Sequence, residues 1–218
     1  MRLRSLSFVA CVACVLPAAP AATVLSENFN ELTPMLSATS VGAFNAIDGT
    51  NVDIVGGALF GSLCVSPEAN TCVDMDGSNG NPQGILQTAS AIILNPGTNY
   101  FLSFDLIGSE RGNTASTTVT LGTSGCTGAG CLYNQTFTLG SSDTTSGIVT
   151  NAPITVTSPT TVYLTFTSNT PGDEGDVLDN VLITSSAVVG IVPEPSSMVL
   201  MGFALLGVGL LGRRLRRL

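Results

Sequence analysis

Four carboxylates fall within seven residues near the end of the polar part of the chain: Asp173, Glu174, Asp176 and Asp179. Closely spaced carboxylate oxygens are ligands that Ca²⁺ prefers. Glu27 would complete such a site if the first and last strands of the domain were neighbours. The spacing therefore predicts a calcium site built from Glu27, Asp173, Asp176 and Asp179, and a solvated acidic loop is the alternative interpretation.

A second acidic run, Asp74-Met75-Asp76-Gly77-Ser78-Asn79, also alternates oxygen ligands on a loop that contains glycine. It departs from the EF-hand pattern, because glycine stands at the fourth position rather than the sixth and Ile85 occupies the twelfth. We interpret this run as an Asx-rich turn rather than as a metal site.

The composition excludes much of the enzyme repertoire, because the 218 residues include no His and no Lys. Ser-His and Cys-His catalysis, His-ligated metals, Schiff bases and P-loop chemistry are thereby excluded. Glycoside hydrolysis needs two carboxylates at a set separation, and no pair stands out in the sequence. We expect a protein that is not an enzyme and has no cofactor apart from the candidate calcium. A secreted carboxylate-dependent enzyme acting on polysaccharide is the alternative.

Arg111 is the only basic residue between positions 5 and 212. We interpret it as the partner of Asp105 or Glu110 in a buried ion pair, with contact to a sugar or an acidic ligand as the alternative. Sugar-binding sites usually contain an exposed aromatic side chain, and this chain has no Trp. Most Tyr and Phe of the central region fall on alternating strand positions, which is typical of core residues.

The charges are strongly segregated along the chain. The net charge is −8 overall, but residues 23–192 hold fourteen acids and one Arg, a net charge of −13. The other six Arg lie within a few residues of the two ends. A strongly acidic body is a poor match for a phosphate backbone, so nucleic acid is not expected as a partner.

The N-terminal end has the pattern of a secretory signal peptide. Arg2 and Arg4 precede an apolar run from Leu6 to Leu16, and Ala19-Pro20-Ala21 offers a small-residue cleavage site. Eleven residues are too short to cross a hydrocarbon core of about 30 Å as a helix. We therefore assign residues 1–21 to the signal peptide.

The C-terminal end predicts a single transmembrane helix over residues 196–212. Its 17 residues would span about 25 Å as a helix, the short limit for a membrane crossing. The basic tail 213–218 is expected to stay cytoplasmic, and the acidic body is expected to lie outside. Residues 188–195 form a linker, which leaves residues 22–187 as the exported domain.

The exported domain shows strand patterns throughout. Apolar residues alternate with polar ones over residues 102–106 and 162–167, and residues 114–121 also predict a strand. On the last predicted strand one face is expected to carry Val177, Asp179, Val181 and Ile183. Turn residues such as Asn95-Pro96-Gly97 separate the strands. The pattern predicts an all-β, two-sheet β-sandwich of jelly-roll type.

Four cysteines remain after removal of the signal peptide, and export places them in an oxidising compartment. Their positions are Cys64, Cys72, Cys126 and Cys131. Three connectivities are possible, and the proximity in sequence favours Cys64–Cys72 and Cys126–Cys131. Zinc binding is disfavoured, because neither pair has Cys-x-x-Cys spacing.

Three features stand in order at the C-terminal end: the triplet Pro193-Glu194-Pro195, the short apolar helix, and the basic residues Arg213, Arg214, Arg216 and Arg217. Together they closely resemble the PEP-CTERM protein-sorting signal. The resemblance implies recognition by an exosortase-type membrane enzyme and delivery to the cell surface or extracellular matrix of a Gram-negative-type bacterium. The protein would be anchored in the membrane before processing. A generic C-terminal tail anchor is the alternative.

The exported domain also resembles carbohydrate-binding jelly rolls that often accompany this signal. The resemblance rests on Ser26–Phe29, Cys72–Gly77, Phe104–Gly112 and Leu178–Val181. It implies a fold more than an activity, and structural calcium is known in such domains. Together the features indicate an exported, non-enzymatic surface or matrix protein with a structural or adhesive role, for which extracellular polysaccharide is a candidate ligand.

Overall fold

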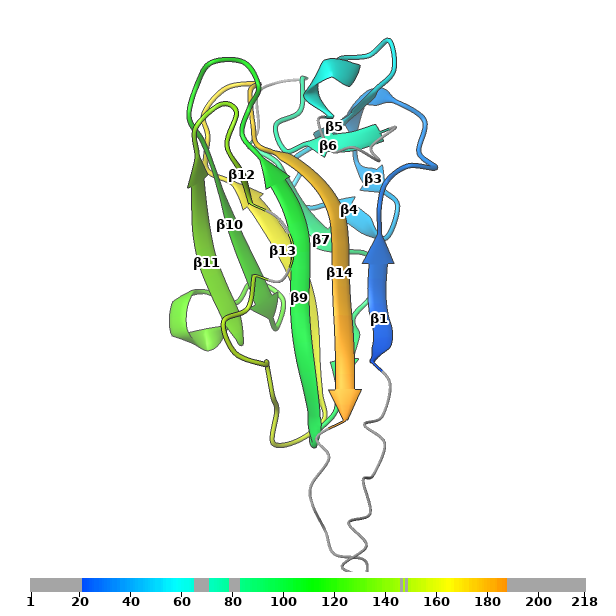
Figure 1. The fold of residues 1–218 in the computed structure, drawn as a ribbon, viewed down its shortest axis with the longest axis vertical. Coiled ribbons are helices and arrows are strands. Elements are labelled where there is room, and N and C mark those ends of the chain that lie inside the picture. The colour runs from blue at the N-terminus through cyan, green and yellow to red at the C-terminus, as the bar shows by residue number, and fades with distance from the viewer. Residues whose placement is uncertain (1–20, 65–70, 79–82, 146, 148, 188–218) are drawn as a thin grey trace, which may run out of the picture. The chain divides into compact units, whose positions relative to one another are not determined.

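The computed structural model describes residues 21–64, 71–78, 83–145, 147 and 149–187. Within these ranges the chain forms two antiparallel β-sheets and no α-helix (Figure 1). None of the described segments is a helix long and apolar enough to cross a membrane. The signal peptide up to residue 20, the linker, the predicted helix 196–212 and the basic tail lie outside the described residues.

The first sheet is built around two long neighbouring strands, β9 and β14 (Figure 1). Its described strands run in the order β12 (Thr144–Thr145), β9 (Thr98–Ile107), β14 (Val177–Ala187), β6 (Thr71–Asp74), β5 (Val52–Gly56) and β2 (Met35–Ala38). Strand β1 (Ala22–Glu27) pairs with the second half of β14. Since Ala22 pairs with Ser185, the start of β1 and the end of β14 lie at the same end of the sheet.

The second sheet packs against the first. Its described strands run in the order β11 (Tyr133–Leu139), β10 (Ala115–Gly122), β13 (Thr160–Ser168), β7 (Ile85–Thr88), β4 (Phe44–Ala46) and β3 (Ser40–Val41). Strand β8 (Ile92–Leu94) pairs with the start of β13. Two single-turn 3₁₀ helices, η1 (Gly61–Leu63) and η2 (Gly128–Gly130), lie in loops. The predicted all-β, two-sheet sandwich is confirmed.

Strand β14 departs from the predicted alternation. The pairing with β9 shifts register between Asp179 and Leu182, and Asn180 has a positive φ of 50°. This irregularity exchanges the two faces of the strand, so Val181 and Ile183 join Leu178 in the main core. Val177 lies instead in a separate apolar cluster. The prediction that Val177, Asp179, Val181 and Ile183 share one face is therefore wrong.

The core between the sheets centres on phenylalanine rings from both layers. Phe166 of β13 meets Phe104 of β9 edge-on, with ring centroids 5.3 Å apart. On its other side Phe166 contacts Phe44 of β4 at 6.1 Å. All three side chains are at most 1% exposed. Burial of each ring contributes roughly 1.5–3 kcal/mol, so this cluster holds the two sheets together.

We predict that Phe166→Ala destabilises the domain by about 3–5 kcal/mol, because it leaves a cavity between the two sheets. Ile93→Ala is the control, since Ile93 is 62% exposed, and it should change the free energy of unfolding by about 0.5 kcal/mol or less. Urea denaturation followed by circular dichroism measures both. Equal effects of the two substitutions would contradict the assigned core.

Candidate functional site

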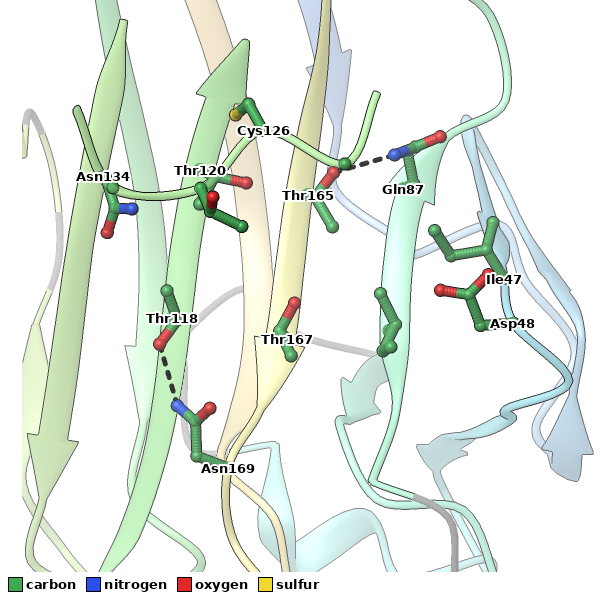
Figure 2. Close-up of a pocket in the computed structure, with 14 residues that line it drawn as sticks. Ile47, Asp48, Gln87, Thr118, Thr120, Cys126, Asn134, Thr165, Thr167 and Asn169 are labelled. Atoms are coloured by element: carbon green, nitrogen blue, oxygen red, sulfur yellow. Dashed lines mark hydrogen bonds between the residues drawn. The ribbon is translucent and has the colours of Figure 1, made fainter. Parts of the chain in front are cut away.

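An open groove of about 310 Å³ crosses the outer face of the second sheet (Figure 2). Its floor is formed by β10, β13 and β7, whose inner faces carry core residues such as Val119, Phe166 and Leu86. Because side chains alternate along a strand, the residues between these core positions point outward. The outward residues that line the groove are Thr118, Thr120, Thr165, Thr167, Ile85 and Gln87.

Strand register arranges these side chains in two rows that run across the strands. One row follows the pairs Thr120↔Thr165 and Thr165↔Gln87, and Asn134 of β11 extends it beyond Thr120. The Gln87 amide Nε2 donates to Thr165 Oγ1 at 3.1 Å. This row is therefore a band of amides and hydroxyls held on rigid backbone.

The second row follows the pairs Thr118↔Thr167 and Thr167↔Ile85. The Asn169 amide Nδ2 donates to Thr118 Oγ1 at 2.9 Å (Figure 2). Thr118 shares a second hydrogen bond of 2.8 Å with Thr136 of β11. The row ends on an aliphatic side chain. The groove thus combines a polar floor with a small apolar surface at the β7 side.

The Cys126–Cys131 loop forms one wall of the groove. Gly125, Cys126 and Gly128 line it where the loop folds back beside β10. A Cβ atom at Gly122 would lie 2.5 Å from Cys126 Sγ, closer than side chains approach one another. Glycine at the end of β10 is therefore what allows the disulfide loop to lie against the sheet.

The opposite wall is the turn that contains Ile47 and Asp48. The Ile47 N–H donates to the Ile85 carbonyl at 2.9 Å, and the Ile85 N–H donates to Thr50 Oγ1 at 3.0 Å. These bonds tie the turn to β7. Asp48 has a φ of 57° and an exposed side chain, so its carboxylate stands at the rim.

Chemically, the groove suits an uncharged ligand rich in hydroxyl groups. Thr hydroxyls and Asn and Gln amides both donate and accept hydrogen bonds. Among the described residues that line the groove, Asp48 is the single charged side chain and none is aromatic. The arrangement can hydrogen-bond the edge of a sugar and contact its C–H face at Ile47 and Ile85, without ring stacking.

Both predicted disulfides are confirmed. Cys64 and Cys72 are bonded with Cα atoms 5.7 Å apart, and Cys126 and Cys131 with Cα atoms 5.4 Å apart. The first bridge lies at a small apolar cluster outside the main core, formed by Val55, Leu63, Cys72, Ile107 and Val177 with Cys64 packed against it. Each bridge therefore has a local role, one at this cluster and one at the groove wall.

The four residues of the predicted calcium site lie in different surroundings. The two carboxylate oxygens of Glu27 accept the Phe29 N–H at 2.9 Å and the Ala43 N–H at 2.7 Å. Asp173 is exposed, whereas Asp176 and Asp179 are buried. Among the described residues no group of three or more His, Cys, Asp or Glu is placed to hold a metal ion. The geometry therefore gives no support to a calcium site built from this set.

Asp176 belongs to a buried polar layer between the sheets. Thr117 of β10 donates to its Oδ2 at 2.8 Å, while Oδ1 has no hydrogen-bond partner among the described residues. Burial raises the pKa of Asp176 to about 7, and the nearby Asp76 carboxylate adds to the rise. Burial also raises the pKa of Asp76, whose two carboxylate oxygens have no hydrogen-bond partner among the described residues.

Asp179 faces a carboxylate of the neighbouring strand, since it is the register partner of Asp105 on β9. Asn180 connects the two: its N–H donates to Asp179 Oδ1 and its Nδ2 donates to Asp105 Oδ2, both at 2.8 Å. Burial, and then the charge of Asp105, raise the pKa of Asp179 to about 6. The left-handed backbone at Asn180 thus allows a polar bridge between β14 and β9.

Arg111 forms an ion pair, as predicted, but with a different partner. Its Nη2 donates to Asp74 Oδ2 on β6, so the expected pairing with Asp105 or Glu110 is wrong. Asp74 was interpreted as a turn residue, yet it is 1% exposed and lies at the end of a strand. Burial outweighs the effect of Arg111 and raises the pKa of Asp74 to about 7.

The sorting residues Pro193, Glu194, Pro195, Arg213, Arg214, Arg216 and Arg217 lie outside the described residues. The groove was not predicted, although its threonines occupy the outward positions of predicted strands. The sequence signal was present in the alternation of Thr with apolar residues at 118–121 and 164–167. That alternation predicts an outer face, but it does not predict which strands pair to make the floor.

Two comparisons of sequence bear on the chain. Residues 192–217 match the PEP-CTERM protein-sorting motif, which confirms the resemblance seen at this end. The motif indicates export with a membrane-anchored sorting signal and implies recognition by an exosortase. No curated protein matches the chain.

Comparison with solved structures finds β-sandwich neighbours of low identity. An apo form of a cyclase from Fischerella sp. is 16% identical, with a TM-score of 0.50 over 78% of this chain and 98% of that one. The CBM22-1 xylan-binding domain of Xyn10C from Paenibacillus barcinonensis is 13% identical, with a TM-score of 0.45 over 80% of this chain and all of that one. These likenesses concern the fold alone.

A further neighbour, the arabinose-bound MgGH51 α-L-arabinofuranosidase, is 13% identical with a TM-score of 0.47. The match covers 72% of this chain and 25% of that enzyme. This chain therefore spans about a quarter of the length of that enzyme.

We predict that the stability of the domain falls as pH rises from about 4 to about 7. Since Asp176 has a raised pKa in the folded state, the stability it contributes is complete below the unfolded pKa of 3.8 and is lost as pH rises through about 7. Between the unfolded and the folded pKa, each such group lowers the free energy of unfolding by about 1.4 kcal/mol for every unit that the pH rises. Melting temperatures at pH 4.5 and 7.5 should show a smaller difference in Asp176→Asn than in the unmodified protein.

Glu31→Gln is the matched control for this experiment, because Glu31 is exposed and the substitution removes one carboxylate in the same way. Its pH profile should follow that of the unmodified protein. Parallel profiles for Asp176→Asn and Glu31→Gln would contradict the assignment of Asp176 as a buried carboxyl group with a raised pKa.

Proposed function

We propose that this chain, which carries the PEP-CTERM sorting motif at residues 192–217, is an exported surface or matrix protein that binds polysaccharide without transforming it. The bacterium would be of Gram-negative type. The helix over residues 196–212 would hold the protein in the membrane until an exosortase acts on the Pro193-Glu194-Pro195 region. The role of the folded domain would then be structural or adhesive.

The observation that carries the proposal is the double row of hydroxyl and amide side chains across β10, β13 and β7. A binding site for an extended polymer needs an open floor with polar groups at repeated spacing. Neighbouring strands place these groups about 4.8 Å apart, and they are held by the sheet before any ligand arrives. Ordering them on binding therefore costs little conformational entropy.

The distribution of carboxylates favours binding over hydrolysis. Glycosidases use two carboxyl groups that flank the bond to be cleaved. Among the described residues that line the groove, Asp48 carries the single carboxylate. The carboxyl groups with raised pKa, at Asp74, Asp76, Asp176 and Asp179, are each at most 1% exposed and lie away from the groove lining. A polymer on the sheet surface would not reach them.

We predict that Thr120→Val with Thr165→Val weakens polysaccharide binding about tenfold or more, because each hydroxyl lost removes about 0.5–1.5 kcal/mol of hydrogen bonding. Valine keeps the branched shape that suits a strand. The control is Thr23→Val with Thr161→Val, two exposed positions outside the groove. Glycan-array binding of the three proteins measures the effect, and equal binding by both double variants would contradict the site.

The rival function is a secreted carboxylate-dependent enzyme. The proposal predicts that no reducing sugar is released from any polysaccharide that the protein binds. Release of reducing sugar that disappears in Asp48→Asn would establish the enzyme instead and overturn the non-catalytic proposal.

Processing at the sorting motif has its own test. If an exosortase-type enzyme acts on the chain, the intact mass of the extracellular form should correspond to a C-terminus near Pro195. A surface form that retains the full basic tail would show a simple membrane anchor, and the sorting part of the proposal would then fail.

A further inference from the structure

Charge in and around the groove narrows the class of polysaccharide that it can bind. In the part of the chain that the structure describes, the residues that line the groove are neutral apart from Asp48, which stands exposed on the wall opposite the disulfide loop. A carboxylate at the rim can accept hydrogen bonds from sugar hydroxyls. It would repel a sugar unit that carries a carboxylate, sulfate or phosphate group.

The domain also has no spare cation to attract an acidic polymer. Arg111 is the only Arg or Lys between residues 21 and 187. It lies in the ion pair with Asp74 of β6, in the other sheet from the groove. Recognition of uronate, sulfate or phosphate groups ordinarily uses Arg or Lys in direct contact. The described groove therefore has donors for hydroxyl oxygens but no cationic partner for an anion.

The electrostatic field of the whole domain also disfavours acidic polymers. With every carboxylate counted as ionised, residues 23–192 carry a formal net charge of −13, so a polyanion approaching the sheet meets repulsion before it reaches the groove. At physiological ionic strength this repulsion decays over a distance of about 8 Å, and it becomes weaker as salt is added. A neutral polymer would be insensitive to both effects.

We infer that the groove selects neutral polysaccharides and excludes those that carry uronic acid or other anionic groups. This inference rests on the proposed function, since it specifies the ligand class of the same groove. Hydroxyl and amide groups of the two rows bind the sugar hydroxyls. Asp48 and the acidic body provide the exclusion.

The test measures binding of the purified exported protein to two sets of soluble probes at low and high salt. The neutral set contains a β-glucan, a xylan without uronic acid and a mannan, and the acidic set contains polygalacturonate and alginate. We expect at least one neutral probe to bind about tenfold or more tightly than either acidic probe at low salt. Binding of the acidic probes should strengthen with added salt, while binding of the neutral probe stays constant.

A pair of variants isolates the contribution of the rim. Asp48→Asn and Glu31→Gln each remove one negative charge from an exposed position, but only Asp48 lines the groove. Relative to the neutral probe, Asp48→Asn should improve binding of the acidic probes about two- to threefold at low salt, and Glu31→Gln should leave that ratio unchanged.

The outcomes separate the two claims. Acidic probes that bind as tightly as neutral ones at low salt would overturn the inference and leave the proposed function intact. If Asp48→Asn and Glu31→Gln change the binding of acidic probes relative to the neutral probe by the same factor, the inference is also overturned. The charge of Asp48 would then have no effect specific to the groove. If no probe of either set binds, both the proposed function and the inference fail.

Discussion

The antiparallel pairing of β10 with β13 determines both the core and the groove. In one register Val119 pairs with Phe166 on the inner face, while Thr118↔Thr167 and Thr120↔Thr165 form on the outer face. Because side chains alternate, a slip of one residue would bury the threonines and expose the phenylalanine. The packing of Phe166 between Phe44 and Phe104 resists that slip, so the aromatic core fixes the positions of the outer hydroxyls.

The end of the sandwich near the start of β14 contains a cluster of buried carboxyl groups. Asp74, Asp76, Asp176 and Asp179 are buried there with a single Arg, and burial raises the pKa of each. Burying a carboxyl group costs less free energy when the group is hydrogen-bonded, and Thr117 donates such a bond to Asp176. This layer makes the domain sensitive to pH at a place distinct from the groove.

Local patterns in the sequence predicted those features that depend on residues close together in the chain. The β-sandwich, the strands around Phe104, Val119 and Leu164, and both disulfides follow from alternation and from cysteine spacing. The irregularity at Asn180 could not be predicted, because it depends on the register with β9 and reverses which residues face the core. The partner of Arg111 was missed for the same reason, since Asp74 lies 37 positions away and only the order of strands brings them together.

The central claim is that sugar hydroxyls contact the threonine rows on the outer face of β10 and β13. Hydrogen–deuterium exchange of the exported protein, with and without a neutral oligosaccharide that it binds, tests this claim most directly. The account predicts slower exchange on binding in the segments that floor and wall the groove, residues 118–128 and 163–169, with little change in β1 and β2. Protection confined to the first sheet, or to the acidic end of the sandwich, would contradict it.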